Sequence, residues 1–211
     1  MRKILLFVWV LLPVAAGAYH YGPGQDRVRA DKAAEAVARA EKAARAARET
    51  AAKEGDDASR PLWAEAESAF EEALALLPAD DVRESRALRL ERDKAQMYVS
   101  RLPDARHDLE SLVGELSGDT AADPKLLDEA RGALANAQYY TTWLMRLEGR
   151  SREEWEPEIE ASRQNYKLLA EKTALKTGGQ AASQARENLE SAIRLARMDL
   201  TELQGLPLPS Q

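Results

Sequence analysis

The stretch AESAFEEALALLP, residues 66–78, places small and aromatic side chains at helical spacing. Its marked positions, separated by four, three, one and four residues, are Ala66, Phe70, Ala73, Leu74 and Pro78. On a helix the first three lie on one face. The alanines allow a neighbouring helix to approach, Phe70 fills the gap between the two helices, and Pro78 ends the helix. The stretch therefore predicts the second half of a helical hairpin that stacks on others.

Looser copies of this pattern occur further along the chain. One copy, shifted by thirty-nine residues, consists of Ala105, Leu109, Leu112 and Val113, with Ser117 at the proline position. Another consists of Ala161, Tyr166 and Leu169, with one spacing a residue longer. The segment LANAQYY, residues 134–140, has the small-small-aromatic character of the first helix of such a hairpin. A pattern that recurs in this way indicates a helical repeat.

Together these residues resemble the tetratricopeptide repeat family. The resemblance covers about residues 30–175 as three degenerate helix pairs, followed by a last helix that acts as a polar cap. It implies an all-α fold in which antiparallel helix pairs stack into a right-handed superhelix. In that family the first helices line a concave side, which holds an extended peptide or a partner helix. The alternative is an unrelated helical bundle in which the same residues pack around one centre.

Composition supports a helical chain and excludes several functions. The 211 residues are 45% hydrophobic and 31% charged but only 6% aromatic. Abundant Ala, Leu, Glu and Arg favour helix almost throughout. A net charge of −6 without a basic stripe argues against nucleic acid as a partner. Because cysteine is absent, thiol catalysis, cysteine-ligated zinc and disulfides are excluded.

The N-terminus has the features of an export signal. Two cations precede an apolar run that reaches Ala18, and small residues favour cleavage before Tyr19. Extended through residue 21, the run is close to the shortest length that crosses a bilayer. Residues 1–18 are therefore a signal peptide or an uncleaved membrane anchor, with membrane contact only through residues 4–21. Either reading places the rest of the chain in the periplasm or on the outer face of the inner membrane.

The remainder divides into a flexible joint at residues 19–26, a helical domain at residues 27–203 and a disordered tail at residues 204–211. Periodicity, caps and breakers predict about seven helices in the domain. They cover residues 27–54, 61–77, 82–101, 104–116, 124–148, 152–175 and 181–203. Residues 55–61 are expected to be a loop, and Gly149 is expected to close a helix in the left-handed conformation.

The alanine-rich segment 27–54 carries only two large apolar residues, Val28 and Val37. We expect its second half to pack closely through alanines. Alternatively, the segment is an exposed spacer or stalk that self-associates.

By the resemblance, residues 83–98 and 128–146 form the inner wall of the superhelix. Arginines and aromatic residues carry much of the binding energy at interfaces. The candidate partner-binding residues on this wall are Arg86, Arg89, Arg92, Asn136, Tyr139, Tyr140 and Arg146. Helical geometry assigns Tyr140, Trp143, Leu144 and Leu147 to a core stripe and leaves Tyr139 nearer the surface. The family's positions that grip a terminal carboxylate are not recognisable.

Catalytic chemistry finds little support. The two histidines, His20 and His107, have no second ligand at metal-binding spacing. The chain contains no phosphate-binding glycine loop and no nucleophile elbow. We therefore expect no enzyme activity, no metal and no cofactor. The sequence predicts a non-catalytic scaffold of the cell envelope that binds a partner protein, with the self-associating spacer as the alternative.

Overall fold

The computed structural model describes residues 23–176 and 180–205, and all regular structure in these ranges is helical. The helices are α2 (Pro23–Glu54), α3 (Asp56–Leu76), α4 (Val82–Tyr98), α5 (Leu102–Gly118), α6 (Pro124–Leu147), α7 (Arg152–Lys176), α8 (Gln180–Arg197) and α9 (Leu200–Gln204). The all-α prediction is confirmed. The expected signal or anchor at residues 1–18 lies outside the described residues, as do residues 19–22 of the expected joint and 206–211 of the expected tail. Residues 23–26, also assigned to the joint, belong to α2, and Gln204, assigned to the tail, is the last residue of α9.

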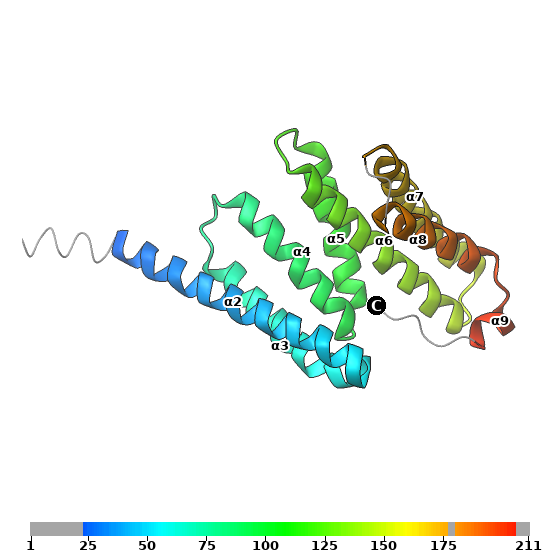
Figure 1. Cartoon of the computed structure of the whole chain (residues 1–211), viewed down its shortest axis with the longest axis horizontal. Coiled ribbons are helices and arrows are strands. Elements are labelled where there is room, and N and C mark those ends of the chain that lie inside the picture. Colours follow the sequence, from blue (N-terminus) through cyan, green and yellow to red (C-terminus); the bar gives the residue numbers. More distant parts are fainter. Residues whose placement is uncertain (1–22, 177–179, 206–211) are drawn as a thin grey trace, which may run out of the picture.

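The helices follow one another as an array of hairpins (Figure 1). Each long helix packs on its neighbours in the sequence, and further contacts join α4 to α6 and α6 to α9. We call α2, α4 and α6 the first helices of three pairs, and α3, α5 and α7 the second helices. The first turns of α2 extend beyond the rest of the array (Figure 1).

The hydrophobic core is divided among successive layers. One cluster joins α2 and α3 to α4, a second joins α4, α5 and α6, and a third joins α6 to the helices that follow it. Helix α4 serves two clusters, with Leu88 in the first and Leu90 in the second. A closed bundle would have its core around one centre, whereas these clusters lie along the array.

The opening motif lies where the sequence predicts. On α3, Ala66, Phe70 and Ala73 are all buried. They pack with the alanines of α2, among which Ala40 and Ala47 are fully buried. Close packing of the second half of α2 through alanines is thus confirmed. The matching positions of the second motif, Ala105, Leu109 and Leu112 of α5, are fully buried as well.

The link between α2 and α3 is shorter than predicted. Only Gly55 separates the two helices, with φ of 93°, a left-handed conformation that glycine adopts without steric cost. The expected loop at residues 55–61 is therefore wrong. A helical turn precedes Pro61, and within it the Ser59 hydroxyl donates a hydrogen bond to the carbonyl oxygen of Asp56.

The starts of α4 and α6 agree with the sequence, whereas α4 ends at Tyr98 rather than at residue 101, and α5 covers Leu102–Gly118 rather than residues 104–116. The Asp81 carboxylate caps α4 by accepting a hydrogen bond from the amide of Glu84, and Asp123 caps α6 ahead of Pro124, as short polar residues at this position commonly do. Gly149, with φ of 73°, follows the end of α6. None of the helices in residues 23–176 and 180–205 is long and apolar enough to cross a membrane.

The C-terminal helix is divided, which the sequence analysis missed. Instead of one helix over residues 181–203, α8 ends at Arg197 and α9 begins at Leu200. Asp199 and Glu202 form a capping box that starts α9, because each side chain accepts a hydrogen bond from the other residue's amide. This local pairing favours a new helix start over continuation of α8.

Candidate functional site

The first helices share a groove on one side of the array. Its volume is about 310 Å³, and it is lined by Arg48 of α2, Trp63 of α3, Lys94, Met97 and Tyr98 of α4, and Glu129, Gly132, Ala133 and Asn136 of α6. Seven of these nine residues come from the segments 83–98 and 128–146, which the sequence analysis assigned to the inner wall. The groove therefore lies where these two segments meet.

Two aromatic rings form the apolar side of the groove. Trp63 and Tyr98 stack with ring centroids 4.3 Å apart and an angle of 6° between their planes. The guanidinium carbon of Arg48 lies 5.6 Å from the centroid of the Trp63 ring, which is within cation–π range. Burial is the main cause that raises the pKa of Tyr98, with the charge of Asp56 acting in the same direction and Arg48 opposing it. Tyr98 therefore stays a neutral phenol at physiological pH.

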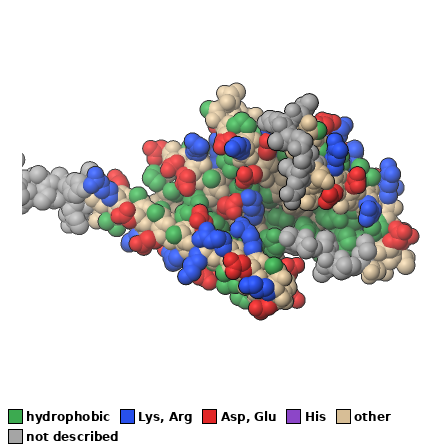
Figure 2. Space-filling model, in the orientation of Figure 1, with side chains coloured by type: hydrophobic (Ala, Val, Ile, Leu, Met, Phe, Trp, Pro, Cys, Tyr) green, Lys and Arg blue, Asp and Glu red, His purple; other side chains and the backbone are tan. Residues whose placement is uncertain are grey.

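Charges of alternating sign connect the three first helices. Arg48 of α2 lies 4.0 Å from Glu91 of α4, Lys94 lies 2.6 Å from Glu91, and Lys94 also lies 3.9 Å from Glu129 of α6. Figure 2 shows basic and acidic side chains gathered over α2 and α4 beside a recess coloured by hydrophobic side chains. The groove thus combines an apolar floor with a charged edge, as binding surfaces often do.

Several hydrogen-bond donors at the groove lack full partners. The indole N–H of Trp63 is buried and finds no acceptor among the described residues. Asn136 is exposed, and its Oδ1 accepts a hydrogen bond from the Tyr166 hydroxyl, while its Nδ2 has no acceptor within the described ranges. Arg48 keeps more than half of its side chain exposed, at 57%. Because the Trp63 N–H is shielded from solvent, the donors that a ligand can reach are those of Arg48 and Asn136.

The three arginines predicted on α4 lie on another side of that helix. Arg86 donates a 2.6 Å hydrogen bond to Asp119, Arg89 donates a 2.9 Å hydrogen bond to Glu115, and Arg92 donates a 2.6 Å hydrogen bond to Asp108. These carboxylates belong to α5 and its C-cap, so the arginines join α4 to α5. The hydrogen bond from Arg86 is the main cause that lowers the pKa of Asp119. None of the three lines the groove.

Asp93 is a buried acid behind this row of ion pairs. Its side chain is fully buried, its Oδ1 accepts hydrogen bonds from Arg92, and its Oδ2 has no partner among the described residues. Burial raises its pKa to about 6, and the charge of Asp108 acts in the same direction, while Arg92 and Arg89 oppose the rise.

The remaining candidates lie on α6, where the predicted core stripe is partly wrong. Tyr140 and Trp143 are buried, but Leu144 and Leu147 are exposed. Thr142 and Arg146 are buried instead, which shows that α6 turns a different face toward the core than the sequence predicts. Tyr139 is partly buried, with its ring edge-on to Tyr140 at 5.7 Å.

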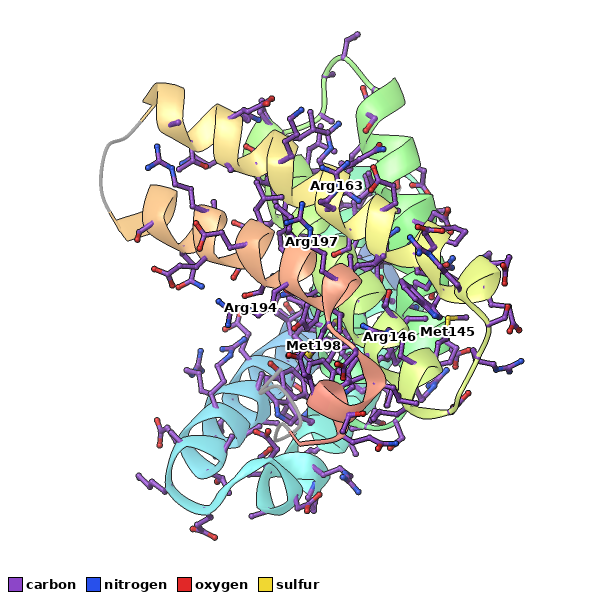
Figure 3. All side chains as sticks on the ribbon, turned by 90° about the vertical axis from the view of Figure 1, so that its right-hand side faces the viewer. Met145, Arg146, Arg163, Arg194, Arg197 and Met198 are labelled. Atoms are coloured by element: carbon purple, nitrogen blue, oxygen red, sulfur yellow. The ribbon has the colours of Figure 1, made fainter. Side chains whose placement is uncertain are left out.

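Arg146 has a structural role within the array. It donates hydrogen bonds to the carbonyl oxygens of Leu195 and Met198, at the C-terminal end of α8, and lies 4.8 Å from the centroid of the Trp155 ring. Figure 3 shows Arg146 next to Met198, below α8. Desolvation lowers its pKa. Of the seven predicted residues, only Asn136 lines the groove.

Two other hollows are lined by elements that follow one another in the chain. A hollow of about 740 Å³ beside α8 and α9 contains Arg194 and Arg197, labelled in Figure 3, but also Glu190 and Glu202. Another, of about 460 Å³, lies where Arg86 and Asp119 join α4 to α5. In the first hollow two arginines and two glutamates share the lining, and in the second Arg86 is already paired with Asp119. The groove alone among the three combines side chains from all three first helices.

Within residues 23–176 and 180–205, no three His, Asp or Glu side chains are grouped so as to hold a metal ion. His107 is exposed on α5.

Sequence reasoning missed the groove residues Arg48, Trp63, Lys94 and Tyr98. Their signal was present but weak: Trp63 is the only tryptophan in α3, and Tyr98 is the only aromatic residue in α4. Arg48 lies on α2, where alanines dominate the pattern.

The described chain is thus an all-α array of helical hairpins with a groove across its first helices. Comparison with protein-family models, with curated proteins and with solved structures gives no match in any of the three.

Proposed function

We propose that this protein is a non-catalytic scaffold of the cell envelope that binds an extended segment of a partner protein in the groove across α2, α4 and α6. The observation that carries this proposal is that one groove draws side chains from the first helix of each pair. A groove of this kind follows from stacking, because neighbouring pairs place their first helices side by side. We further propose that the pairs continue this stacking as a tetratricopeptide-like right-handed superhelix, an inference supported by the layered core.

We propose an extended segment because the groove runs across the helices, from Arg48 on α2 to Asn136 on α6. An extended chain rises about 3.3 Å per residue, so a few residues are enough to cross it.

The predicted export signal supports a location outside the cytoplasm. The cationic, apolar and small-residue pattern of residues 1–18 is typical of export, whether the segment is cleaved or kept as an anchor. We therefore place the helical array in the periplasm, released or held at the outer face of the inner membrane.

The spacer alternative has less support. A self-associating stalk needs a free apolar seam on α2, and the alanine face that would supply it is buried against α3. Only the first turns of α2 extend freely, and their one large apolar residue is Val28, which is 48% exposed.

The proposal is tested by photocrosslinking in intact cells. A photoreactive amino acid at Asn136, in the groove, is compared with one at Ser111, which is exposed on α5 and does not line the groove. We expect a discrete adduct from position 136 alone. Ala133→Leu adds bulk at a lining residue that is only 6% exposed, and it should abolish this adduct while circular dichroism shows that the helical fold is retained. The purified partner should bind the wild-type chain in titration calorimetry more tightly than the Ala133→Leu variant. Equal adducts from both positions, or an adduct unaffected by Ala133→Leu, would contradict the proposal.

A further inference from the structure

Resting on the proposed function, we infer that the segment bound in the groove carries an acidic side chain that pairs with Arg48, next to an apolar side chain that covers Trp63 and Tyr98. This names the chemistry of the partner: an extended protein segment in which an interior Asp or Glu is adjacent to an apolar residue.

The charges around the groove single out Arg48 as the available cation. Lys94 lies between two carboxylates, with Glu91 at 2.6 Å and Glu129 at 3.9 Å. The nearest carboxylate to Arg48 is that of Glu91, which lies 4.0 Å away and is already paired with Lys94. That separation is beyond hydrogen-bond distance. A guanidinium offers five N–H donors, and those of Arg48 make no hydrogen bond to any described residue. A partner carboxylate would satisfy two of them at once.

The apolar surface next to Arg48 determines which side chain lies beside the acid in the bound segment. The Trp63–Tyr98 stack and Met97 form an apolar floor from α3 to α4, and Ala133 continues it onto α6. Trp63, Met97 and Ala133 are already buried, so the apolar surface that a partner can still cover is mainly that of Tyr98, and an apolar side chain gains free energy by covering it. At the α6 edge, Nδ2 of Asn136 can donate to a backbone carbonyl of an extended segment, because the Tyr166 hydroxyl already fixes the orientation of Oδ1.

Other kinds of segment fit this groove less well. A basic side chain next to Arg48 would meet a like charge, and Glu129, which is 61% exposed and 3.9 Å from Lys94, could pair with a cation only at the α6 edge. A neutral segment would leave the Arg48 donors without a charged acceptor. The chain as a whole carries a charge of −6, which disfavours acidic partners at long range. Recognition of the acid must therefore come from short-range contact with Arg48.

The test uses a library of random eight-residue segments, displayed with both ends fused so that no terminal carboxylate is free. Three full-length proteins in detergent micelles are used to select binding segments from the library: the wild type, Arg48→Gln and Arg45→Gln. Arg45 is a matched control, since it is on the same helix, is 62% exposed and does not line the groove. We expect wild type and Arg45→Gln to enrich segments with Asp or Glu next to an apolar residue, and Arg48→Gln to lose that enrichment.

A selected segment then enters a double-mutant cycle. Changing its acid to the matching amide should weaken binding to the wild-type chain by about tenfold and leave binding to Arg48→Gln nearly unchanged. Circular dichroism of each variant checks that the fold is retained.

The test distinguishes failure of the inference about Arg48 from failure of the proposed function. If the wild-type chain enriches segments without acids, or if the amide weakens binding to both chains equally, the inference about Arg48 is overturned while the scaffold function stands. If the wild-type chain retains no more segments than Ala133→Leu does, the groove is not a binding site and the proposed function fails with it.

Discussion

Trp63 of α3 and Tyr98 of α4 stack face to face across the boundary between the first and second helix pairs, with centroids 4.3 Å apart. This contact joins two layers of the array and also forms the apolar floor of the groove. Its removal should therefore affect stability as well as binding.

We expect Trp63→Ala to lower the free energy of unfolding by about 3–5 kcal/mol, because it removes a large buried side chain and leaves a cavity. Tyr98→Phe keeps the stacked ring and should cost less than about 1 kcal/mol. Urea denaturation of both variants measures the difference. Equal losses would show that the ring of Trp63 contributes no more than the hydroxyl of Tyr98.

Asp93→Asn should stabilise the protein near neutral pH. The folded-state pKa of Asp93, about 6, lies above its ordinary value of 3.8. Its contribution to stability is therefore fully present below about pH 4 and is lost as the pH rises through 6. Asparagine is neutral throughout and avoids this loss. The gain should approach about 3 kcal/mol at pH 7.5, because each unit of pKa shift corresponds to about 1.4 kcal/mol.

The measurement is denaturant unfolding of the wild-type and Asp93→Asn chains from pH 4 to pH 8. The difference between them should shrink toward zero as the pH falls to 4. A constant difference across this range would mean that Asp93 does not change its protonation state. Asp108→Asn, which alters the more exposed end of the same network, is a useful comparison.

Gly55→Ala should destabilise the hairpin of α2 and α3 by about 1 kcal/mol or more, because a left-handed conformation disfavours a side chain. The φ of this single linking residue is 93°. Gly114→Ala is the matched control. Gly114 lies inside α5, and an added Cβ would meet no side chain or other element within 4 Å. Alanine there should stabilise the chain by about 0.5–1 kcal/mol. Thermal unfolding should move the two variants in opposite directions; a shift in the same direction would contradict the role of Gly55.

Arg146→Gln should lower the free energy of unfolding by about 2–3 kcal/mol, because two carbonyl groups lose a charged donor. Both carbonyls lie at the end of α8. Hydrogen exchange should show the loss of protection concentrated in residues 195–203. Arg150→Gln, at an exposed arginine after the end of α6, should change little. Uniform loss of protection in Arg146→Gln would argue against a local role at the α8–α9 junction.

The sequence predicted the helical array well wherever the signal was local. The burial of Phe70 and Leu109 follows from spacing along one helix, and the start of α6 follows from Asp123 and Pro124. The sequence predicts a break after residue 54, but it does not show that Gly55 alone is enough to reverse the chain. That depends on how closely the alanine face of α2 approaches α3.

The candidate site was harder to predict because it depends on contacts between distant residues. Arg86, Arg89 and Arg92 have the residue type of a binding face, yet their partners lie 33, 26 and 16 residues away on α5 and its C-cap. Arg48 and Asn136 are far apart in the sequence but line the same groove. Residue type indicates that a side chain is able to bind a partner protein. The fold decides whether that side chain is already paired with another residue of the same chain.

Because the core is divided among successive layers, the protein can unfold in parts. Among the described helices, no single centre ties the first hairpin to the last, so each end can open while the middle stays folded. Helices α8 and α9 have neighbours on only one side of the array and should fray earliest during gradual denaturation. The hairpin of α4 and α5 is held from both directions, so a mild stress that loosens the C-terminal end should spare the groove floor.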